Sequence, residues 1–123
     1  MAKTILIVDD SAGIRQIVSF TLKSAGYNVI EGVDGADALA KLAGKKKVHL
    51  IICDVNMPVM DGISFVKKIK KSADYKFTPI IMLTTESQEK KKMEGLEAGA
   101  KAWVVKPFLP EQMLNAVSKL IMP

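Results

Sequence analysis

Apolar residues in this chain gather in short runs, and the polar segments between the runs have a different spacing. The five runs are Ile5–Val8, Val29–Ile30, Val48–Cys53, Ile80–Leu83 and Ala102–Val105. The first, third and fourth read as continuous hydrophobic stretches rather than as an alternation of apolar and polar residues. Continuous stretches of this length are typical of parallel strands that are covered on both faces. The pattern therefore predicts five strands of a buried sheet.

Between the runs, apolar residues recur three or four positions apart, which is the spacing of one helix face. The first stripe comprises Ile14, Ile17, Val18, Leu22 and Ala25, the third comprises Ile63, Val66 and Ile69, and the fifth comprises Met113, Leu114, Val117, Leu120 and Ile121. Gly26 can end the first helix, Asp34 can cap a second that ends at Gly44, and Pro110 opens the last. Each run is thus followed by a predicted helix.

The fourth predicted helix, around residues 87–98, differs from the other four. Met93 and Leu96 are its only large apolar residues. A helix with so few apolar contacts opens more easily than its neighbours. We therefore expect this helix to be the least stable element of the fold.

Strands that alternate with helices predict an α/β fold, with a doubly wound, five-stranded parallel sheet in a (βα)5 arrangement. A length of 123 residues fits a single domain, 1–123, with a core of its own. No repeat, linker or low-complexity tract interrupts the pattern. Because the pattern runs out after the fifth helix, we expect no output domain.

The composition restricts the cellular compartments in which the protein is expected. The single cysteine, Cys53, excludes an internal disulfide, and no apolar stretch approaches the ~20 residues of a membrane span. We therefore expect a cytoplasmic protein without membrane insertion. The net charge of +5 owes much to lysine runs at 45–47 and 90–92, within which no aromatic residue is interleaved. Solvated lysines explain these runs better than steering toward an acidic partner, and nothing predicts nucleic-acid binding.

Polar residues follow four of the five runs. Asp9 and Asp10 follow the first, Asp54 the third, Thr84 the fourth and Lys106 the fifth. In an open parallel sheet, ligands bind outside the carboxyl ends of the strands, so these five side chains should converge on one edge. Each alone has an ordinary structural interpretation as a helix cap, a strand residue or a surface turn. Their joint placement at four strand ends favours a functional site.

These residue types suit phosphoryl chemistry. Three neighbouring carboxylates repel one another and are tolerable only with a cation, and Mg²⁺ prefers such oxygen ligands. A metal ion and a lysine would neutralise a phosphoryl group on the remaining carboxylate, and a hydroxyl can bond one of its oxygens. An aspartate in this setting is a nucleophile toward phosphorus. The Lys106–Pro107 bond can be cis, which would help to turn the lysine inward.

The stretches "ILIVDDS", "ICDVNMPVMDG", "IIMLTTE" and "WVVKPF" together resemble the motifs of the response-regulator receiver family, and most closely those of its single-domain chemotaxis regulators. The resemblance implies a flavodoxin-like sheet with strand order 2-1-3-4-5. It implies that Asp54 accepts a phosphoryl group from a histidine kinase. Asp9, Asp10 and Asp54, with the backbone of Asn56, would then hold Mg²⁺, and Thr84 and Lys106 would contact the phosphoryl oxygens.

The resemblance also implies a switch. Thr84 would move toward the phosphoryl group, and the aromatic residue at position 103 would follow, reshaping a target-binding face made by the fourth helix, fifth strand and fifth helix. Receivers usually carry Tyr, Phe or a smaller residue there, so Trp103 is either a larger switch residue or a passive core aromatic. Asn56 and Glu86 match fast-decaying members of the family, which implies a short-lived phosphoryl group. We expect a monomer, and we assign His49 no role.

Other functions remain open at this point. Within the family, the chain could be a phosphorelay intermediate rather than a chemotaxis regulator. A Mg²⁺-dependent phosphohydrolase would use similar residues, but it resembles a pattern with its nucleophile on the first strand and an acid two residues later, where this chain has Ser11. A flavin-binding electron carrier would need a phosphate-binding loop where Asp9 and Asp10 would repel the anion. We therefore predict a signalling switch rather than an enzyme.

Overall fold

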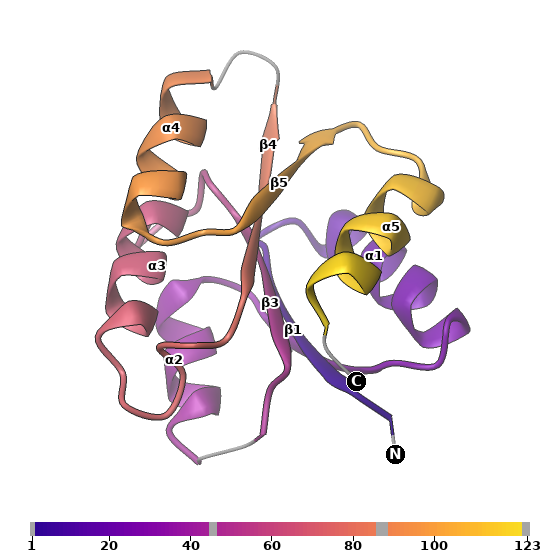
Figure 1. Cartoon of the computed structure of the whole chain (residues 1–123), viewed down its shortest axis with the longest axis horizontal. Helices are drawn as coiled ribbons and strands as arrows, with labels where there is room; N and C mark the ends of the chain where they lie inside the picture. Colours follow the sequence, from indigo (N-terminus) through magenta and orange to yellow (C-terminus); the bar gives the residue numbers. More distant parts are fainter. Residues whose placement is uncertain (1, 45–46, 86–88, 122–123) are drawn as a thin grey trace.

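The computed structural model describes residues 2–44, 47–85 and 89–121 as five strands that alternate with five helices (Figure 1). The strands are β1 (Thr4–Val8), β2 (Asn28–Gly32), β3 (Leu50–Asp54), β4 (Ile80–Thr85) and β5 (Ala102–Lys106). The helices are α1 (Ala12–Ser24), α2 (Gly35–Leu42), α3 (Gly62–Lys70), α4 (Glu89–Ala98) and α5 (Pro110–Leu120). The predicted (βα)5 order is confirmed.

All strand pairs are parallel, and the sheet has the order β2-β1-β3-β4-β5. The central strand β3 is buried along its whole length. In its register, Ile52 lies between Ile7 of β1 and Ile81 of β4. Because every strand runs in the same direction, their carboxyl ends meet at one edge of the sheet. The predicted doubly wound, flavodoxin-like sheet is confirmed.

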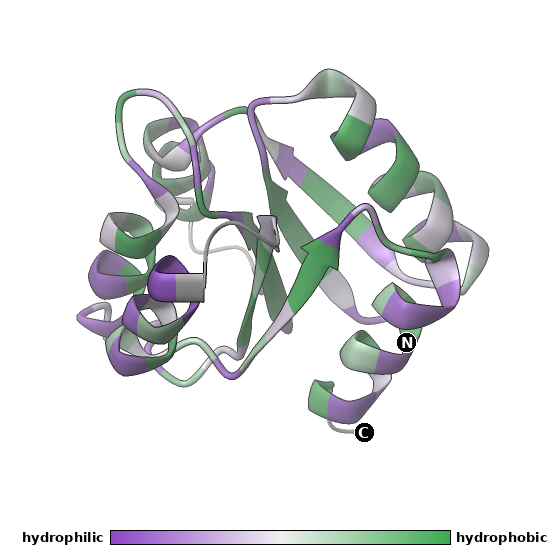
Figure 2. Cartoon of the chain, turned by 90° about the horizontal axis from the view of Figure 1, so that it is seen from above, coloured by the Kyte–Doolittle hydropathy of each residue, from purple (hydrophilic) through white to green (hydrophobic). Residues whose placement is uncertain are grey.

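Helices cover the sheet on both faces (Figures 1 and 2). On one face, α1 and α5 pack against alternate strand residues such as Ile7, Ile52 and Leu83. On the other, α2 and α3 pack against the residues between them, such as Cys53 and Met82. The alternation of side chains along a strand divides the core in this way, which is why the strand sequences are apolar at successive positions.

Local sequence signals set most helix ends. Ser11 and Asp34 cap α1 and α2, where their side chains accept hydrogen bonds from Ile14 N and Asp37 N. Pro110 is the first residue of α5, as predicted. Gly26, with φ of 94°, follows the cap residue Ala25 at the end of α1. These caps satisfy backbone groups that a helix leaves unpaired at its ends.

Some element boundaries differ from the prediction, and β3 begins at Leu50 rather than at the predicted Val48. Strand β2 is longer than the predicted Val29–Ile30, because pairing with β1 continues through Glu31 and Gly32. An edge strand is half exposed and can contain polar residues, so the hydrophobic pattern alone underestimates its length. The predicted start of the fourth helix at residue 87 lies outside the described residues. Among the helices that the structure describes, none combines the length and the apolar character needed to cross a membrane.

Candidate functional site

Carboxylates from two neighbouring strands meet at the carboxyl edge of the sheet. Asp54 is the last residue of β3 and is 6 % exposed, and Asp9 directly follows β1 and is completely buried. Asp10 is exposed beside them. Each of the three offers a carboxylate oxygen, and these oxygens lie within 4.8 Å of one another. The structure therefore brings together the three aspartates that the sequence singled out.

Lys106 joins two of these carboxylates. Its Nζ donates to Asp54 Oδ1 at 3.0 Å and to Asp9 Oδ2 at 3.3 Å. The lysine ends β5, and the Lys106–Pro107 peptide bond is cis. The contact with Asp9 was not foreseen, because strand ends can be ordered from sequence but the direction of a long side chain cannot. We call Asp9, Asp10, Asp54 and Lys106 the carboxyl-edge cluster.

Burial and pairing act in opposite directions on the pKa values of the cluster. Burial raises the pKa of Asp54 above its ordinary value, although the hydrogen bond from Lys106 lowers it, and the charge of Asp9 raises it further. Burial lowers the pKa of Lys106, but its hydrogen bond to Asp54 and the two carboxylate charges outweigh burial, so that this pKa is raised. The lysine is therefore firmly protonated, and Asp54 holds its negative charge at an energetic cost.

Asp9 is held on the side away from Lys106 as well. Its Oδ1 accepts from the backbone N–H of Ser11 at 2.9 Å, and its carbonyl accepts from Arg15 Nη1 at 2.6 Å. Arg15 also pairs with Glu31 at 3.3 Å. Arg15 and Glu31 were missed at the sequence level. Their only signal is that Arg15, the single arginine of the chain, lies one helical turn after Ser11.

The loop after β3 forms the outer wall of the site. Asn56 is exposed and lines a hollow of about 310 Å³ together with Asp10, Met57, Pro58 and Asp61. Asp61 also caps α3, because its Oδ1 accepts from Ser64 N at 2.8 Å. Its place in the wall adds a carboxylate that was not foreseen, although it lies within the quoted stretch "ICDVNMPVMDG".

The loop closes tightly at Gly62. Its backbone N–H donates to the carbonyl of Val55 at 2.8 Å. A Cβ atom at this position would lie 2.1 Å from the carbonyl oxygen of Asp54. Because backbone atoms cannot yield to such an overlap, only glycine fits here. The first residue of α3 is therefore packed directly against the backbone of the proposed phosphoacceptor.

Thr84 and Trp103 lie on adjacent strands beside the cluster. Thr84 is 2 % exposed and pairs with Val105, and Trp103 pairs with Met82 two residues earlier on β4. Alternation along the strands therefore puts Thr84, Met82 and Trp103 on the face covered by α3 and α4. Ala102 and Val104 pack on the opposite face, which Lys106 shares by the same alternation. This is the arrangement that strand periodicity predicts.

Trp103 is half-buried, and Lys92 of α4 lies over its ring, with Nζ 3.7 Å from the ring centroid. A cation in this position is attracted by the electrons of the ring face. Lys92 was not singled out in the sequence. Glu86, which the sequence named beside Asn56, lies outside the described residues.

The donor set of the cluster fits a magnesium ion. Its groups are hard carboxylate oxygens from Asp9, Asp10 and Asp54, and Mg²⁺ is bound by such groups with the help of water. A divalent cation would also relieve repulsion that a single lysine only partly balances. His49, in contrast, lies elsewhere: its Nδ1 accepts from the backbone N–H of Thr4 at 3.0 Å, which ties the segment before β3 to β1.

Comparisons with known proteins agree with the fold and with the residues gathered at its edge. The response regulator receiver domain matches residues 5–118 of this chain. The chemotaxis protein CheY1 of Helicobacter pylori is 40 % identical over 108 residues, which cover 87 % of each chain. A chemotaxis protein CheY homologue of Campylobacter jejuni is 39 % identical over 118 residues, covering 95 % of this chain and 91 % of that protein.

A solved structure gives the same result. The chemotaxis protein CheY4 of Vibrio cholerae superposes with a TM-score of 0.91 at 51 % sequence identity, covering 98 % of this chain and 99 % of that one. The resemblance read from the four motifs therefore extends to the whole fold. The chain belongs to the family of response regulator receiver domains.

Proposed function

We propose that this receiver is a phosphorylation switch of chemotaxis signalling, in which Asp54 accepts a phosphoryl group from a histidine kinase. The observation that carries the proposal is the pairing of Asp54 Oδ1 with Lys106 at the tip of the central strand, beside Asp9 and Asp10. This pairing holds the carboxylate at the carboxyl edge of the sheet and balances part of its charge.

The transfer begins with attack of an Asp54 carboxylate oxygen on phosphorus, and the bond from phosphorus to the donor's imidazole nitrogen breaks. Lys106, already hydrogen-bonded to Asp54, offsets the negative charge that the phosphoryl group brings. Mg²⁺, when held by Asp9, Asp10 and Asp54 with the backbone of Asn56, would supply further positive charge at the phosphoryl oxygens. Because the nucleophile is the ionised carboxylate, phosphorylation should fail as the pH falls below the raised pKa of Asp54.

The response to phosphorylation is proposed to pass from Thr84 to Trp103. Thr84 would bond a phosphoryl oxygen and leave space on the face that it shares with Trp103. An indole overfills a pocket suited to a phenol ring at a cost of about 1–3 kcal/mol, and the contact with Lys92 also holds it outward. We therefore expect a shift in rotamer population rather than a complete inward swing.

The surface that would change is formed by α4, β5 and α5. A hollow of about 650 Å³ lies there between β5 and α5, with Trp103, Gln112, Asn115 and Lys119 in its lining. A downstream protein bound over this hollow would contact Trp103 directly. The role in chemotaxis is inferred from the similarity to chemotaxis proteins of Helicobacter, Campylobacter and Vibrio.

Labelling of two aspartate variants tests the acceptor. Wild type, Asp54→Asn and the matched control Asp74→Asn are incubated with radiolabelled acetyl phosphate and Mg²⁺. Asp74 is exposed in the loop after α3, so its variant should label like wild type. We expect no label on Asp54→Asn although it remains folded. Undiminished labelling of that variant would refute the assignment.

Trp103, the only tryptophan, tests the switch. Its fluorescence should change when beryllofluoride and Mg²⁺ are added together, and Asp54→Asn serves as the control for metal alone. If wild type responds no more than this control, Trp103 is a passive core residue and the signal travels by another route.

Phosphotransfer profiling against the histidine kinases of the source organism would separate the candidate pathways. A chemotaxis regulator takes phosphate from a chemotaxis kinase and loses it within seconds to minutes, as the match of Asn56 to fast-decaying relatives implies. A phosphorelay intermediate would instead pass the group on to a histidine of another protein. Turnover of a generic phosphomonoester would favour the phosphohydrolase.

A further inference from the structure

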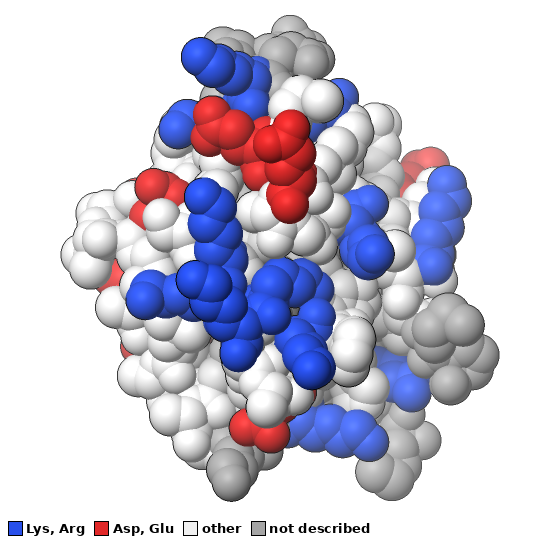
Figure 3. Space-filling model, turned by 60° about the vertical axis from the view of Figure 1, so that its left-hand side comes forward, with Lys and Arg blue, Asp and Glu red and all other residues white. Residues whose placement is uncertain are grey.

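A cationic surface lies far from the proposed phosphorylation site, at the carboxyl end of α3. The segment 67–76 contains five lysines and one aspartate, Asp74, so it is strongly cationic within a chain whose net charge is +5. Lys67, Lys68, Lys71 and Lys76 are exposed, as is Lys101 at the start of β5. Figure 3 shows lysine side chains gathered on this side of the molecule.

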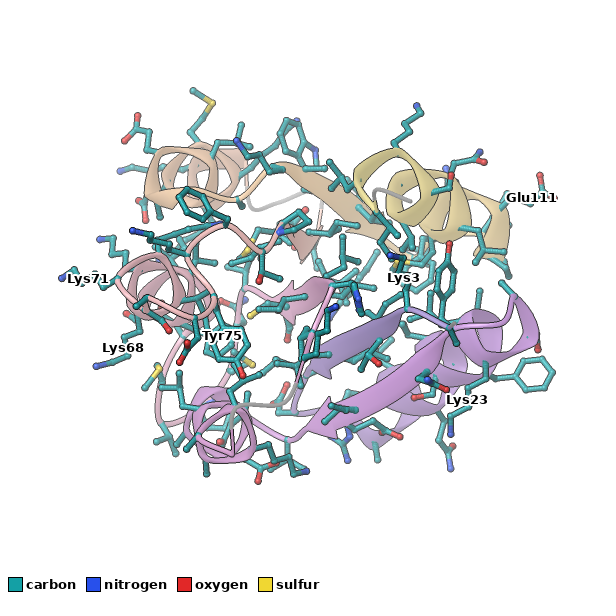
Figure 4. All side chains as sticks on the ribbon, turned by 60° about the horizontal axis from the view of Figure 1, so that its bottom comes forward. Lys3, Lys23, Lys68, Lys71, Tyr75 and Glu111 are labelled. Atoms are coloured by element: carbon teal, nitrogen blue, oxygen red, sulfur yellow. The ribbon has the colours of Figure 1, made fainter. Side chains whose placement is uncertain are left out.

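Two lysines of this surface, Lys68 and Lys71, project outward from α3. Figure 4 shows Lys68 and Lys71 extending from α3 into solvent, whereas Tyr75 turns inward, where its hydroxyl donates to the carbonyl of Leu42 at 3.1 Å. Lysines in the last turn of a helix do interact favourably with its carboxyl end. That effect does not account for Lys76 and Lys101, which lie outside the helix.

Phe77 adds an apolar anchor to this surface. Its side chain is 87 % exposed, and the ammonium group of Lys76 lies 5.1 Å from its ring centroid. An exposed aromatic ring beside a cation has the composition of a binding hot spot, since such rings bury a large area at little cost in side-chain entropy.

The surface is held in place by Lys70. Its Nζ donates to the carbonyls of Lys76 at 3.1 Å and Thr78 at 2.9 Å, which fixes the backbone on both sides of Phe77. Its aliphatic part packs against Gly99, where an added Cβ would lie 2.9 Å from Lys70 Cγ. Lys70 therefore holds the loops that carry Lys76 and Lys101 against α3. A surface that is preorganised in this way loses less entropy on binding.

We propose that this surface binds an acidic segment of a partner protein, which places one apolar side chain against Phe77. We call it the α3 lysine surface, and it comprises Lys67, Lys68, Lys71, Lys76, Phe77 and Lys101. A nucleic acid fits less well, because the cations are lysines without arginine forks and a single ring offers no series of stacking platforms. A membrane fits less well, because one phenyl ring is far less than the continuous apolar face of an interfacial helix.

Docking here would not depend on phosphorylation. α3 starts against the backbone of Asp54 and extends about 13 Å away from it over nine residues, so the lysines lie at the opposite edge of the sheet. The α3 lysine surface would hold a partner continuously, while the face formed by α4, β5 and α5 responds to the switch. Binding at the α3 lysine surface can therefore be tested separately from phosphorylation of Asp54.

The test is an NMR titration of ¹⁵N-labelled protein with a synthetic twelve-residue peptide that carries six Asp or Glu residues around one Leu. We expect shifts at residues 67–78 and 101, and equal affinity for wild type and Asp54→Asn. Lys68→Glu with Lys71→Glu should weaken binding at least tenfold, and Phe77→Ala severalfold. The matched control, Lys23→Glu with Lys119→Glu, makes the same change in net charge at exposed positions of α1 and α5, on the other face of the sheet, and should bind like wild type.

Thermal unfolding confirms that each variant is folded before it is titrated. Equal loss of affinity in the control pair would show unspecific attraction and overturn the proposal, as would shifts outside these residues. A single-stranded oligonucleotide of equal charge and anionic lipid vesicles are the comparison ligands. Tighter binding of either one than of the peptide would overturn the assignment to a protein segment.

Discussion

The carboxyl-edge cluster and the α3 lysine surface are both rich in charge, but the charges are largely buried in the first and exposed in the second. In the carboxyl-edge cluster, Asp9 and Asp54 are almost removed from water and share the single ammonium group of Lys106. On the α3 lysine surface, like charges stand in solvent and repel one another only weakly. Buried charge stores free energy that a ligand can release, whereas exposed charge acts mainly on the rate and selectivity of encounter.

Lys106→Met should have the largest effect, since it leaves two carboxylates without their hydrogen-bonded cation. We expect unfolding in metal-free buffer at pH 7 to need about 3 kcal/mol less than for wild type. Urea titration followed by circular dichroism measures this. Lys101→Met, an exposed control, should change the free energy of unfolding by less than about 0.5 kcal/mol. Equal losses of unfolding free energy in the two variants would show that a partly buried and an exposed lysine contribute alike to stability, contrary to this prediction.

Asp10→Ala should act in the opposite direction. Removing one of three repelling carboxylates should raise the metal-free stability by about 1 kcal/mol, which is several degrees in Tm for a domain of this size. The same variant should lose the stabilisation that Mg²⁺ gives to wild type. Calorimetric scans with and without Mg²⁺ check both effects, with Asp74→Ala as the control. A variant that melts below wild type without metal would contradict the repulsion.

A smaller effect is expected in the pH dependence of stability. The pKa of Asp54 is raised in the folded protein, mainly by burial, so the folded state binds its proton more readily than the unfolded chain does. Metal-free stability should therefore increase as the pH falls from 7 through the folded pKa toward the ordinary aspartate range. In Asp54→Asn this contribution should vanish. Parallel pH profiles of the two proteins would show that another group is responsible.

Replacing Lys68 and Lys71 by Glu should have the smallest effect on folding. Exposed charges are screened, and we expect a change of no more than about 0.5 kcal/mol in either direction. The measurement is a denaturant titration at low and at physiological salt. A large, salt-independent loss of unfolding free energy would mean that these lysines stabilise the fold. The α3 lysine surface would then differ from the carboxyl-edge cluster only in the size of its contribution to stability.

The carboxyl-edge cluster could be predicted from sequence because its members are strand-end residues. Once the runs before Asp9, Asp54 and Lys106 are parallel strands, the direction of the chain places all three at one edge. The same reasoning fails for Arg15 and Lys92, whose long side chains reach partners that no local pattern specifies. The same reasoning also predicts too short a β2, because Glu31 in this edge strand interrupts the apolar run.

Phe77 shows a different limit. In the sequence it is an aromatic residue among lysines, and burial in the core is the ordinary expectation for such a residue. Its exposure depends on Lys70, which fastens the loop at Lys76 and Thr78 and leaves the ring outside. A tertiary contact of this kind is set by the packed fold and not by spacing along the chain.

The tight packing of Gly62 has a consequence for mutational tolerance. In a library that randomises every codon and selects for phosphotransfer, tolerance normally reports chemistry, and Asp54 and Lys106 should accept almost no replacement. Gly62 has no functional group, yet even alanine would force its methyl group into the carbonyl oxygen of Asp54. We expect Gly62 to be as intolerant as the nucleophile itself, so deep mutational scanning would count it among the reacting residues although its contribution is the space that it leaves empty.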